Sequence, residues 1–262
     1  MSLTNKSPAS TYKDLLYVDN NNNGVDSTKR QILSGGGTSS SMQVSDRGLL
    51  VKSETDNTSA LDIQNSGGTS KLLVDTTNSY VKANGVHVNT QYAYFNINNE
   101  GTASFGANTH YAVNHSGNAY TAPAYPISFG TSTDPATTFT TAEGNGTRGS
   151  NLTTVLWYAP DAISVDSVVS IEGADTADGA TTRMHLMSYT LNSGSTSALS
   201  AGTLIAHNTP ITNLGSEQVY KSTWIVDSAA VTAGKVLVAT FLQADTSDDY
   251  SLNIVVKYHI TG

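Results

Sequence analysis

Short apolar segments, each ended by Asn, Gly, Ser or Thr, run from Ala60 to Pro123. The segments are rich in β-branched and aromatic residues, which favour strands, and the residues between them favour turns. The dipeptide Asn84-Gly85 is a strong signal for a hairpin turn. The pattern predicts short antiparallel strands at residues 48–52, 60–64, 71–75, 80–82, 86–89 and 92–97.

Part of this region repeats itself loosely. Residues 97–105 recur as residues 113–120, and a weaker echo lies at residues 74–81. Each unit holds only a few apolar side chains, and an isolated hairpin of this size is marginal in water. Repeats of this kind gain stability from their neighbours. The sequence therefore predicts that identical units on other chains are the neighbours. An ordinary β-meander within one globular domain is the alternative.

The pattern changes after residue 126, where the apolar segments become longer. The segment at residues 235–242 is apolar almost throughout, which is typical of a strand covered on both faces. Turn residues recur at short intervals, as they do in antiparallel β-sandwiches. Strands are expected at residues 153–159, 165–172, 181–191, 219–227, 235–243 and 252–260.

The predicted fold class is all-β, in three parts. Residues 1–45 are expected to form a short extended N-terminal arm, and residues 46–123 an intertwined β-hairpin shaft. Residues 124–262 are expected to form a distal antiparallel β-sandwich with a jelly-roll-like arrangement. A domain of this last size can bury roughly two-thirds of the surface of its unfolded chain, so it is expected to fold alone.

Composition and charge exclude several classes of protein. Charged residues make up 13% of the chain, and its net charge is −8. Residues 1–52 hold six Lys or Arg and four Asp, whereas residues 134–262 hold five Lys or Arg and twelve Asp or Glu. Neither part has the basic density of a nucleic-acid binder. The chain has no cysteine, no apolar run long enough to span a membrane, and no apolar signal-peptide core at its start.

Two motifs resemble ligand-binding sites, but we interpret the first as a mobile loop and the second as a turn. Residues 144–149 fit the dinucleotide pattern G-x-G-x-x-G, which works only between a strand and a helix. Residues 152–158 are expected to form a strand, so the required helix is missing. Residues 19–24 match the first half of a calcium loop, but Arg30 stands where the loop needs a bidentate Glu. An Asx-type turn is therefore predicted there.

Histidines are the remaining candidates for metal binding. His110 and His115 are close in sequence, and a threefold axis would triple each of them. Their odd spacing on a strand places them on opposite faces, so they cannot simply share one metal ion. Both are predicted to be partly exposed polar histidines. The remaining histidines show no ligand spacing, and no metal or cofactor is expected: His87, His185, His207 and His259.

No catalytic pattern stands out in the sequence. There is no G-x-S-x-G elbow and no cysteine nucleophile. A glycosidase needs two carboxylates, but the acidic candidates lie in Gly/Thr/Ser-rich stretches that are expected to be exposed loops: Asp175, Asp178, Asp245, Asp248 and Asp249. The protein is therefore not expected to be an enzyme.

Two regions resemble bacteriophage proteins. Residues 11–20 (TYKDLLYVDN) and 24–32 (GVDSTKRQI) look like the N-terminal segment of phage virion fibre and decoration proteins. Residues 60–75 (ALDIQNSGGTSKLLVD) and 113–119 (VNHSGNA) resemble repeats in phage fibre shafts. In plan, the chain is similar to the trimeric cement proteins and head fibres of short-tailed phages. The resemblance implies a homotrimer with an anchor on the particle, a β shaft and a distal sandwich.

The leading hypothesis is therefore a capsid decoration (cement) or head-fibre protein that binds and reinforces the capsid exterior and presents an adhesive head. Its expected partners are two further copies of itself, the major capsid protein of the same virion and a host-surface glycan. Its expected location is the virion exterior, after assembly in the host cytoplasm. The alternative is a tail fibre or receptor-binding protein that contacts host-surface glycans. A secreted enzyme or lectin-like domain that acts on glycans is a third hypothesis.

An apolar cluster in the first 45 residues is the candidate capsid-attachment site. Its members, which lack enough neighbouring chain to cover them, are Tyr12, Leu15, Leu16, Tyr17 and Val18. Exposed apolar patches bounded by polar residues mark interaction sites, and aromatic residues are favoured as interface anchors. We expect this cluster to dock on the particle, while the acidic C-terminal domain faces outward.

Overall fold

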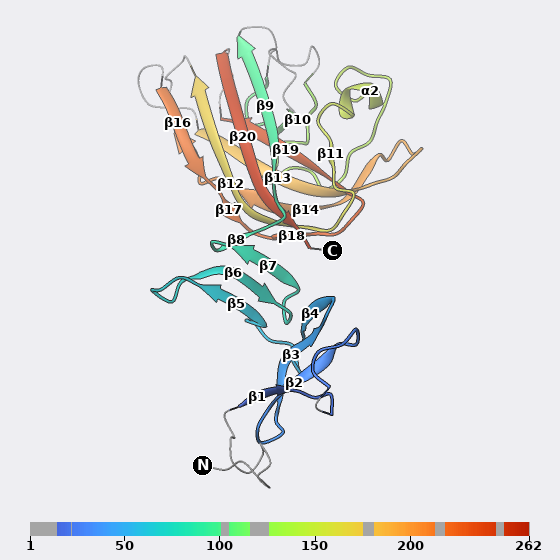
Figure 1. The fold of residues 1–262 in the computed structure, drawn as a ribbon. Coiled ribbons are helices and arrows are strands. Elements are labelled where there is room, and N and C mark those ends of the chain that lie inside the picture. The colour runs from blue at the N-terminus through green and yellow to red at the C-terminus, as the bar shows by residue number, and fades with distance from the viewer. Residues whose placement is uncertain are drawn as a thin grey trace, which may run out of the picture. The chain divides into compact units, whose positions relative to one another are not determined.

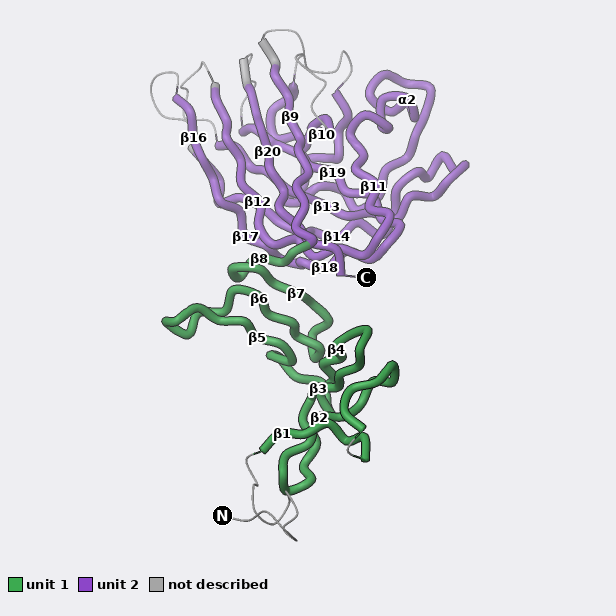
Figure 2. Tube along the Cα trace, viewed as in Figure 1, with its two compact units in different colours: residues 1–88 green, residues 89–262 purple. Residues whose placement is uncertain are grey.

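The computed structural model describes residues 15–21, 23–100, 105–115, 126–174, 181–212, 218–244 and 249–261. The regular secondary structure of the described chain is almost entirely β-strand, and its strand pairings are antiparallel, as predicted (Figure 1). It divides into two compact units, residues 1–88 and residues 89–262, which we call unit 1 and unit 2 (Figure 2).

Unit 1 begins with a four-stranded sheet whose strands follow the order of the sequence. In the turn between the first two strands, Asn20 donates from Nδ2 to the carbonyl oxygen of Gly24 at 2.7 Å, and Arg30 forms an ion pair with Asp26 at 2.9 Å. The hydrogen bond from Arg30 lowers the pKa of Asp26. The segment that resembles half a calcium loop is thus a turn, as predicted. The strands are β1 (Leu16–Val18), β2 (Arg30–Ser34), β3 (Ser39–Ser45) and β4 (Gly48–Val51).

A second four-stranded sheet completes unit 1. Its strands agree with the predicted ones to within two residues, and they are β5 (Leu61–Gln64), β6 (Ser70–Asp75), β7 (Tyr80–Ala83) and β8 (Val86–His87). Asn84 and Gly85 form the predicted hairpin turn, with φ angles of 50° and 81°. Two successive positive φ values are what a tight two-residue hairpin needs. The turn between β6 and β7 is held by Asp75, which accepts hydrogen bonds from the backbone N–H and the Nδ2 of Asn78, both at 2.8 Å.

Unit 2 is a twelve-stranded antiparallel sheet that curls until it nearly closes on itself. Its main path runs β16-β12-β20-β9-β10-β19-β13-β14-β17. Only Trp224 separates β16 from β17, and its N–H donates to the carbonyl oxygen of Val168 at 3.0 Å. Because β16 pairs with β12 and β17 pairs with β14, the two ends of the path meet at this residue.

The elements of unit 2 are short and long strands with one brief helix. In chain order they are β9 (Thr90–Glu100), β10 (Tyr111–His115), α2 (Gly149–Leu152), β11 (Trp157–Tyr158), β12 (Ile163–Ala174), β13 (Thr181–Leu191), β14 (Leu199–His207), β15 (Ile211–Thr212), β16 (Gln218–Thr223), β17 (Ile225–Val226), β18 (Ala230–Val231), β19 (Lys235–Gln243) and β20 (Asp249–Ile260). The bounds of β13 and β19 are the predicted ones.

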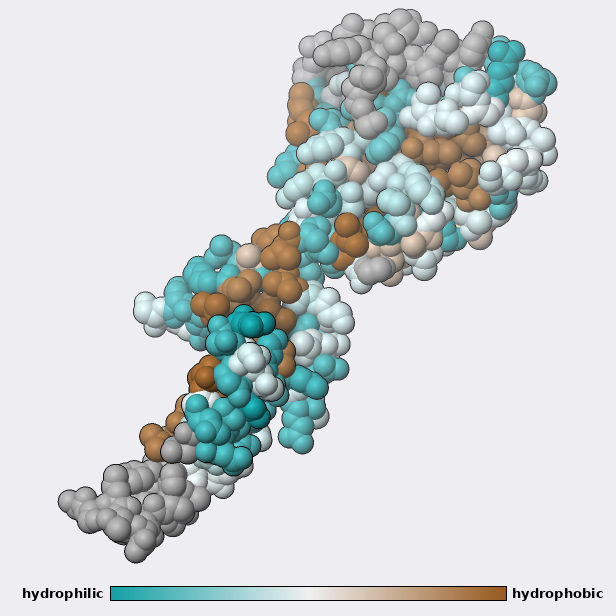
Figure 3. All heavy atoms as spheres, turned by 45° about the vertical axis from the view of Figure 1, so that its right-hand side comes forward, coloured by the Kyte–Doolittle hydropathy of each residue, from teal (hydrophilic) through white to brown (hydrophobic). Residues whose placement is uncertain are grey.

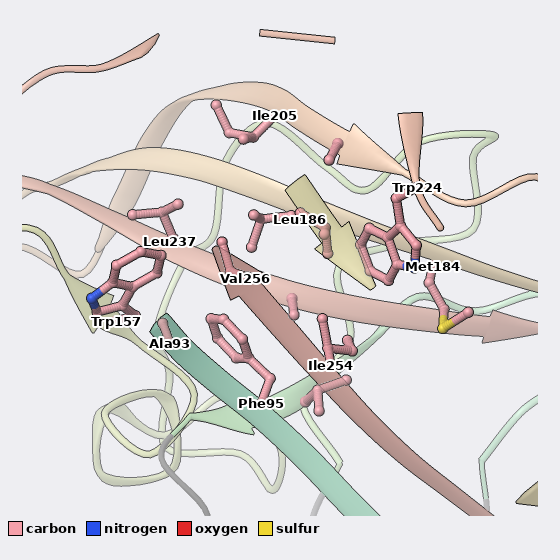
Figure 4. Packing of buried hydrophobic residues seen from close by; sticks show 14 of the residues in the cluster. Ala93, Phe95, Trp157, Met184, Leu186, Ile205, Trp224, Leu237, Ile254 and Val256 are labelled. Carbon is pink, nitrogen blue, oxygen red and sulfur yellow. The ribbon is translucent and has the colours of Figure 1, made fainter. Parts of the chain in front are cut away.

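The inward side chains of this sheet form the main hydrophobic core (Figure 4). Phe95 and Met184 are fully buried there, although they come from distant parts of the chain. Trp157 and Trp224 are also buried in this core. Trp224 donates its indole N–H to the Oγ of Ser170 at 2.9 Å, which satisfies a polar group that would otherwise be unpaired in an apolar environment.

A second apolar cluster lies on the outer side of β19 and β13. It joins Val238 and Met187 of these strands to Ile127, Phe129 and Val155 of the segment at residues 126–155. That segment therefore covers the outer face of this half of the sheet.

The units do not divide at residue 123, where the shaft was expected to end. β9 pairs with β20 along nearly its whole length, and β10 pairs with β9 and β19. Ala93, Phe95 and Ile97 are buried in the core of unit 2. Alternation along a strand shows that one face is buried but does not identify the strand's partners. The sequence pattern therefore did not distinguish β9 and β10 from the strands of the expected shaft.

Two local predictions are wrong. The strand expected at residues 153–159 is limited to β11, and residues just before it form α2, where the N–H of Leu152 donates to the carbonyl oxygen of Arg148. β14 was not predicted, because Ser200, Ala201 and Gly202 interrupt its apolar pattern.

Candidate functional site

Unit 1 has no apolar core of its own among the residues that the structure describes. All the buried apolar side chains belong to unit 2, beginning with Ala93. The buried polar side chains of unit 1 are those of Asn20 and Asp75, which hold turns. Figure 3 shows apolar residues, in brown, exposed along unit 1 beside polar residues in teal. The strands of unit 1 are therefore held by backbone pairing with their apolar side chains still partly in water.

One face of the β5–β8 sheet is apolar across all four strands. The register aligns Leu61 with Val74 and Val81, and it aligns Ile63 with Leu72 in the next row. Directly opposed side chains lie on the same face of a sheet, so the two rows form one continuous surface. Ile63 remains 51% exposed. We call this surface the apolar face of β5–β8; its residues are Leu61, Ile63, Leu72, Val74, Val81, Ala83 and Val86.

The opposite face of the same sheet is largely polar. Its central row is Asp62, Leu73 and Lys82. The Nζ of Lys82 lies over the ring of Tyr80, 4.3 Å from its centroid. Asp62 accepts a hydrogen bond from the amide of Gln64. The sheet is thus amphipathic, and its polar face suits solvent while its apolar face suits another protein surface.

The β1–β4 sheet is built in a similar way. On one face, Val18 lies opposite Ile32, and Val44 lies opposite Leu49. Arg30 lies opposite Val44 on this face, and its charge is paired with Asp26. On the other face, Gln43 donates to the side-chain oxygen of Gln31 at 3.0 Å. We call the first surface the apolar face of β1–β4; its residues are Leu16, Val18, Ile32, Met42, Val44, Leu49 and Val51.

The structure places four of the five predicted attachment residues, since Tyr12 lies outside the described residues. Leu15, Leu16 and Tyr17 are exposed, and Val18 is half-buried. Leu16 and Val18 belong to the apolar face of β1–β4, whereas Tyr17 points to the other side, opposite Leu33. The predicted cluster is therefore divided between two faces, because it forms a strand.

The apolar face of β5–β8 was not predicted as a site, although the sequence contains the signal for it. The Asn84-Gly85 turn fixes the register of β7 and β8, and period-two alternation in the preceding strands then aligns their apolar residues. Because the strands were considered one at a time, the surface that they form together was not recognised.

A row of histidines on the outer side of unit 2 was also missed. His185 on β13 lies opposite His207 on β14, with ring centroids 6.4 Å apart, and the ring of His110 lies 4.9 Å from that of His185. His110 is fully buried, so the prediction that it is partly exposed is wrong. His115 instead stacks on Trp157, which confirms that His110 and His115 lie on opposite faces.

Burial keeps part of this row neutral. It lowers the pKa of His110, and burial together with the charges of His110, His207 and Arg183 lowers the pKa of His185 to about 3. His110 Nε2 lies 2.9 Å from the carbonyl oxygen of Ser132. Among the described residues, the Nδ1 atoms of His110 and His185 have no hydrogen-bond partner. His110 and His185 thus form a buried polar pair beside the partly exposed His207, and their lowered pKa values predict that the stability of unit 2 depends on pH.

Among the described residues, the Gly-rich motif does not form a nucleotide-binding site. The segment at residues 144–149 is followed by a helix, contrary to prediction, but α2 has only four residues. A Cβ on Gly146 would lie 2.6 Å from the carbonyl oxygen of Pro126, so the glycine there serves chain packing. Asp175, Asp178, Asp245 and Asp248 lie outside the described residues, and the side chain of Asp249 is not described either.

The sequence matches no model of a known protein family, and a search of curated proteins finds no significant match. Within the described parts of the chain, no helix has the length and apolar character needed to cross a membrane.

Proposed function

We propose that this protein is a homotrimeric bacteriophage structural protein that binds the capsid exterior and reinforces it, as a cement or head-fibre protein does. The observation that carries the proposal is the apolar face of β5–β8, which lies in a unit whose described residues include no buried apolar side chain. The resemblance of residues 11–20, 24–32, 60–75 and 113–119 to phage fibre and decoration proteins supports attachment to a phage particle and assembly as a trimer.

Association of chains through unit 1 follows from its energetics. The side chains of each apolar face are partly exposed to water. Burying them would stabilise the assembly by about 25 cal/mol for each Å² of apolar surface. A small sheet without a covered face is marginal in water. Packing the apolar faces of three β5–β8 sheets around a common axis would give unit 1 the core that a single chain lacks. In this arrangement the polar faces, with Asp62 and Lys82, point to solvent.

The central test replaces one row of side chains with serine and compares the result with the same replacement of a second row on the same strands. The triple variant Leu61→Ser, Val74→Ser, Val81→Ser removes a row of the apolar face. The matched control, Asp62→Ser, Leu73→Ser, Lys82→Ser, removes the row on the opposite face. We expect light scattering to give a trimer for the wild type and the control, and a smaller mass for the apolar-row variant.

Fluorescence of Trp157 and Trp224, both in unit 2, checks that the variants remain folded there. A wild-type protein that is a folded monomer at micromolar concentration would refute assembly through unit 1. Loss of the trimer in both variants would show that the apolar face has no special role.

Copy number separates decoration from a tail location. The alternative, a tail fibre or receptor-binding protein, would be present in a handful of copies on each purified particle. A protein that covers the local threefold positions of a shell would be present in hundreds. Quantitative gel or mass-spectrometric analysis of purified particles decides between them, and a handful of copies would contradict the capsid assignment.

A further inference from the structure

The outer surface of unit 2 has a covered half and an uncovered half. The segment at residues 126–155 covers the outer side of β19 and β13 through the second apolar cluster. The outer side chains of β9, β20, β12 and β16 belong to neither apolar cluster. These four strands lie side by side in the sheet, in the order β16-β12-β20-β9 (Figure 1). Their outer face is therefore open in the described chain.

Two tyrosines stand next to each other on this open face. Tyr92 and Tyr94 lie two residues apart on β9, so they point to the same side of the sheet, and they are 53% and 49% exposed. Tyr94 lies opposite Val255, and Val255 lies opposite Val169 on β12. Ring faces and aliphatic side chains thus form an apolar strip across three strands, which we call the tyrosine strip: Tyr92, Tyr94, Val169 and Val255.

Amides and ammonium groups border the tyrosine strip. Asn96 on β9 lies opposite Asn253 on β20, in the row next to Tyr94. Lys257 lies directly opposite Tyr92, and Lys221 lies opposite Ile171 at the far side of the sheet. A side-chain amide both donates and accepts hydrogen bonds, and a lysine offers a positive charge.

Two of the five basic residues of unit 2 lie on this open face. Residues 89–262 contain thirteen Asp and Glu but five Lys and Arg, two of which are Lys221 and Lys257. Neither lysine forms an ion pair with a described residue. Glu172 of β12 is buried on the inner side, and Asp166 is 2.8 Å from His259 Nδ1. Two lysines without an ion pair among the described residues therefore lie on the same face as the exposed aromatic rings.

We propose that the tyrosine strip and its border bind an acidic polysaccharide. Tyrosine rings give apolar surface to the C–H faces of sugar rings, Asn96 and Asn253 match hydroxyl groups that both donate and accept, and Lys221 and Lys257 attract carboxylates. Two lysines on an acidic unit are too few for a nucleic-acid backbone. This inference rests on the proposed function and deepens it by naming the ligand class of unit 2.

The test uses the full chain and three acidic polysaccharides with different backbones: polygalacturonate, hyaluronate and alginate. Methyl-esterified polygalacturonate is the neutral comparison. Affinity electrophoresis should show retardation by at least one acidic polymer and less retardation by the ester. We expect Tyr92→Ala with Tyr94→Ala to weaken binding by about tenfold or more, as loss of central aromatic contacts does. Lys257→Gln should reduce the salt dependence of binding.

Tyr158→Ala is the matched control, because Tyr158 is also an exposed tyrosine of unit 2 but lies on β11, which pairs with β19. It should bind like the wild type. Absence of binding to all three acidic polymers, or an equal loss in the control, would overturn the proposal. A smaller mass for the Tyr92→Ala, Tyr94→Ala variant in light scattering would also overturn it, by assigning the strip to contact between copies. The trimer itself is tested separately through the row of Leu61, Val74 and Val81.

Discussion

The imidazole rings of His110 and His185 meet edge to face in a buried site on the outer side of β13, with an interplanar angle of 80°. Neither ring can take up a proton without placing a positive charge beside the other in a poorly solvated site. Desolvation of this kind disfavours the charged form of histidine.

Unit 2 is therefore expected to lose stability as the pH falls below neutrality. The pKa of His185 is lowered from 6.5 to about 3, so below pH 6.5 the unfolded chain binds a proton that the folded chain does not. Each such histidine lowers the free energy of unfolding by up to about 1.4 kcal/mol per pH unit between these two values. His110 and His115 shift in the same direction. Urea denaturation monitored by tryptophan fluorescence at pH 7, 6 and 5 measures the effect.

The variant His185→Gln separates the contribution of this histidine to the pH dependence of stability from the contribution of the Asp and Glu side chains. The variant is compared by the slope of its unfolding free energy against pH, not by its absolute stability. Between pH 6 and 5, this slope should decrease by nearly the contribution of one bound proton, about 1.4 kcal/mol per pH unit. An unchanged slope would show that His185 is not the group responsible.

The pair of Trp224 and Ser170 provides a second prediction. Ser170→Ala leaves the buried indole N–H of Trp224 without its acceptor, which should cost about 1–3 kcal/mol of unfolding free energy. Ser251→Ala makes the same chemical change at an exposed position of β20 and should be close to neutral. Equal effects of the two substitutions in chemical denaturation would contradict the role of this hydrogen bond.

The boundary of the independently folding part is a third prediction. Residues 89–262 should melt cooperatively, because they include β9 and β10. Residues 124–262 should not, because without β9 and β10 the strands β20 and β19 lose partners and the core loses Phe95 and Val113. Near-ultraviolet circular dichroism of the two truncated chains compares them directly. A cooperative transition of residues 124–262 would show that β9 is dispensable.

Attachment to the particle is a fourth prediction, and it rests on the proposed function. Replacing Tyr12, Leu15 and Leu16 together with Ser should give a folded trimer that no longer adds to bare particles, because apolar anchors supply most of the affinity of such contacts. Arg47→Ser with Lys52→Ser is a control that removes charge but no apolar anchor. Full decoration of bare particles by the triple variant would place the anchor elsewhere in the chain.

Much of the strand content could be predicted from the sequence, because alternation and turn dipeptides are local signals. β13 and β19 have the predicted bounds, and Asn84-Gly85 forms the predicted turn. The partners of β9 could not be predicted, because its pairing with β20 joins residues far apart in the chain. β14 was missed because Gly202 interrupts its pattern; a Cβ there would lie 2.6 Å from the ring of Tyr189, so packing requires the glycine.

The candidate sites were harder to predict, since each depends on register between strands. Tyr12 to Val18 was recognised as a run of apolar residues, whereas Leu61 and Val74 become neighbours only through pairing. The same holds for His185 and His207, which are adjacent across two strands but separated in sequence.

The meeting of β16 and β17 at Trp224 has a consequence for aggregation. Unpaired strand edges are where β proteins recruit further chains into insoluble assemblies, and a sheet that nearly closes leaves little such edge. Unit 2 should therefore resist aggregation when the protein is produced at high concentration. The two small sheets of unit 1 end in β1, β4, β5 and β8, whose outer backbone groups have no neighbouring strand in the described chain. Insoluble material from an unassembled chain is expected to begin at these four edges.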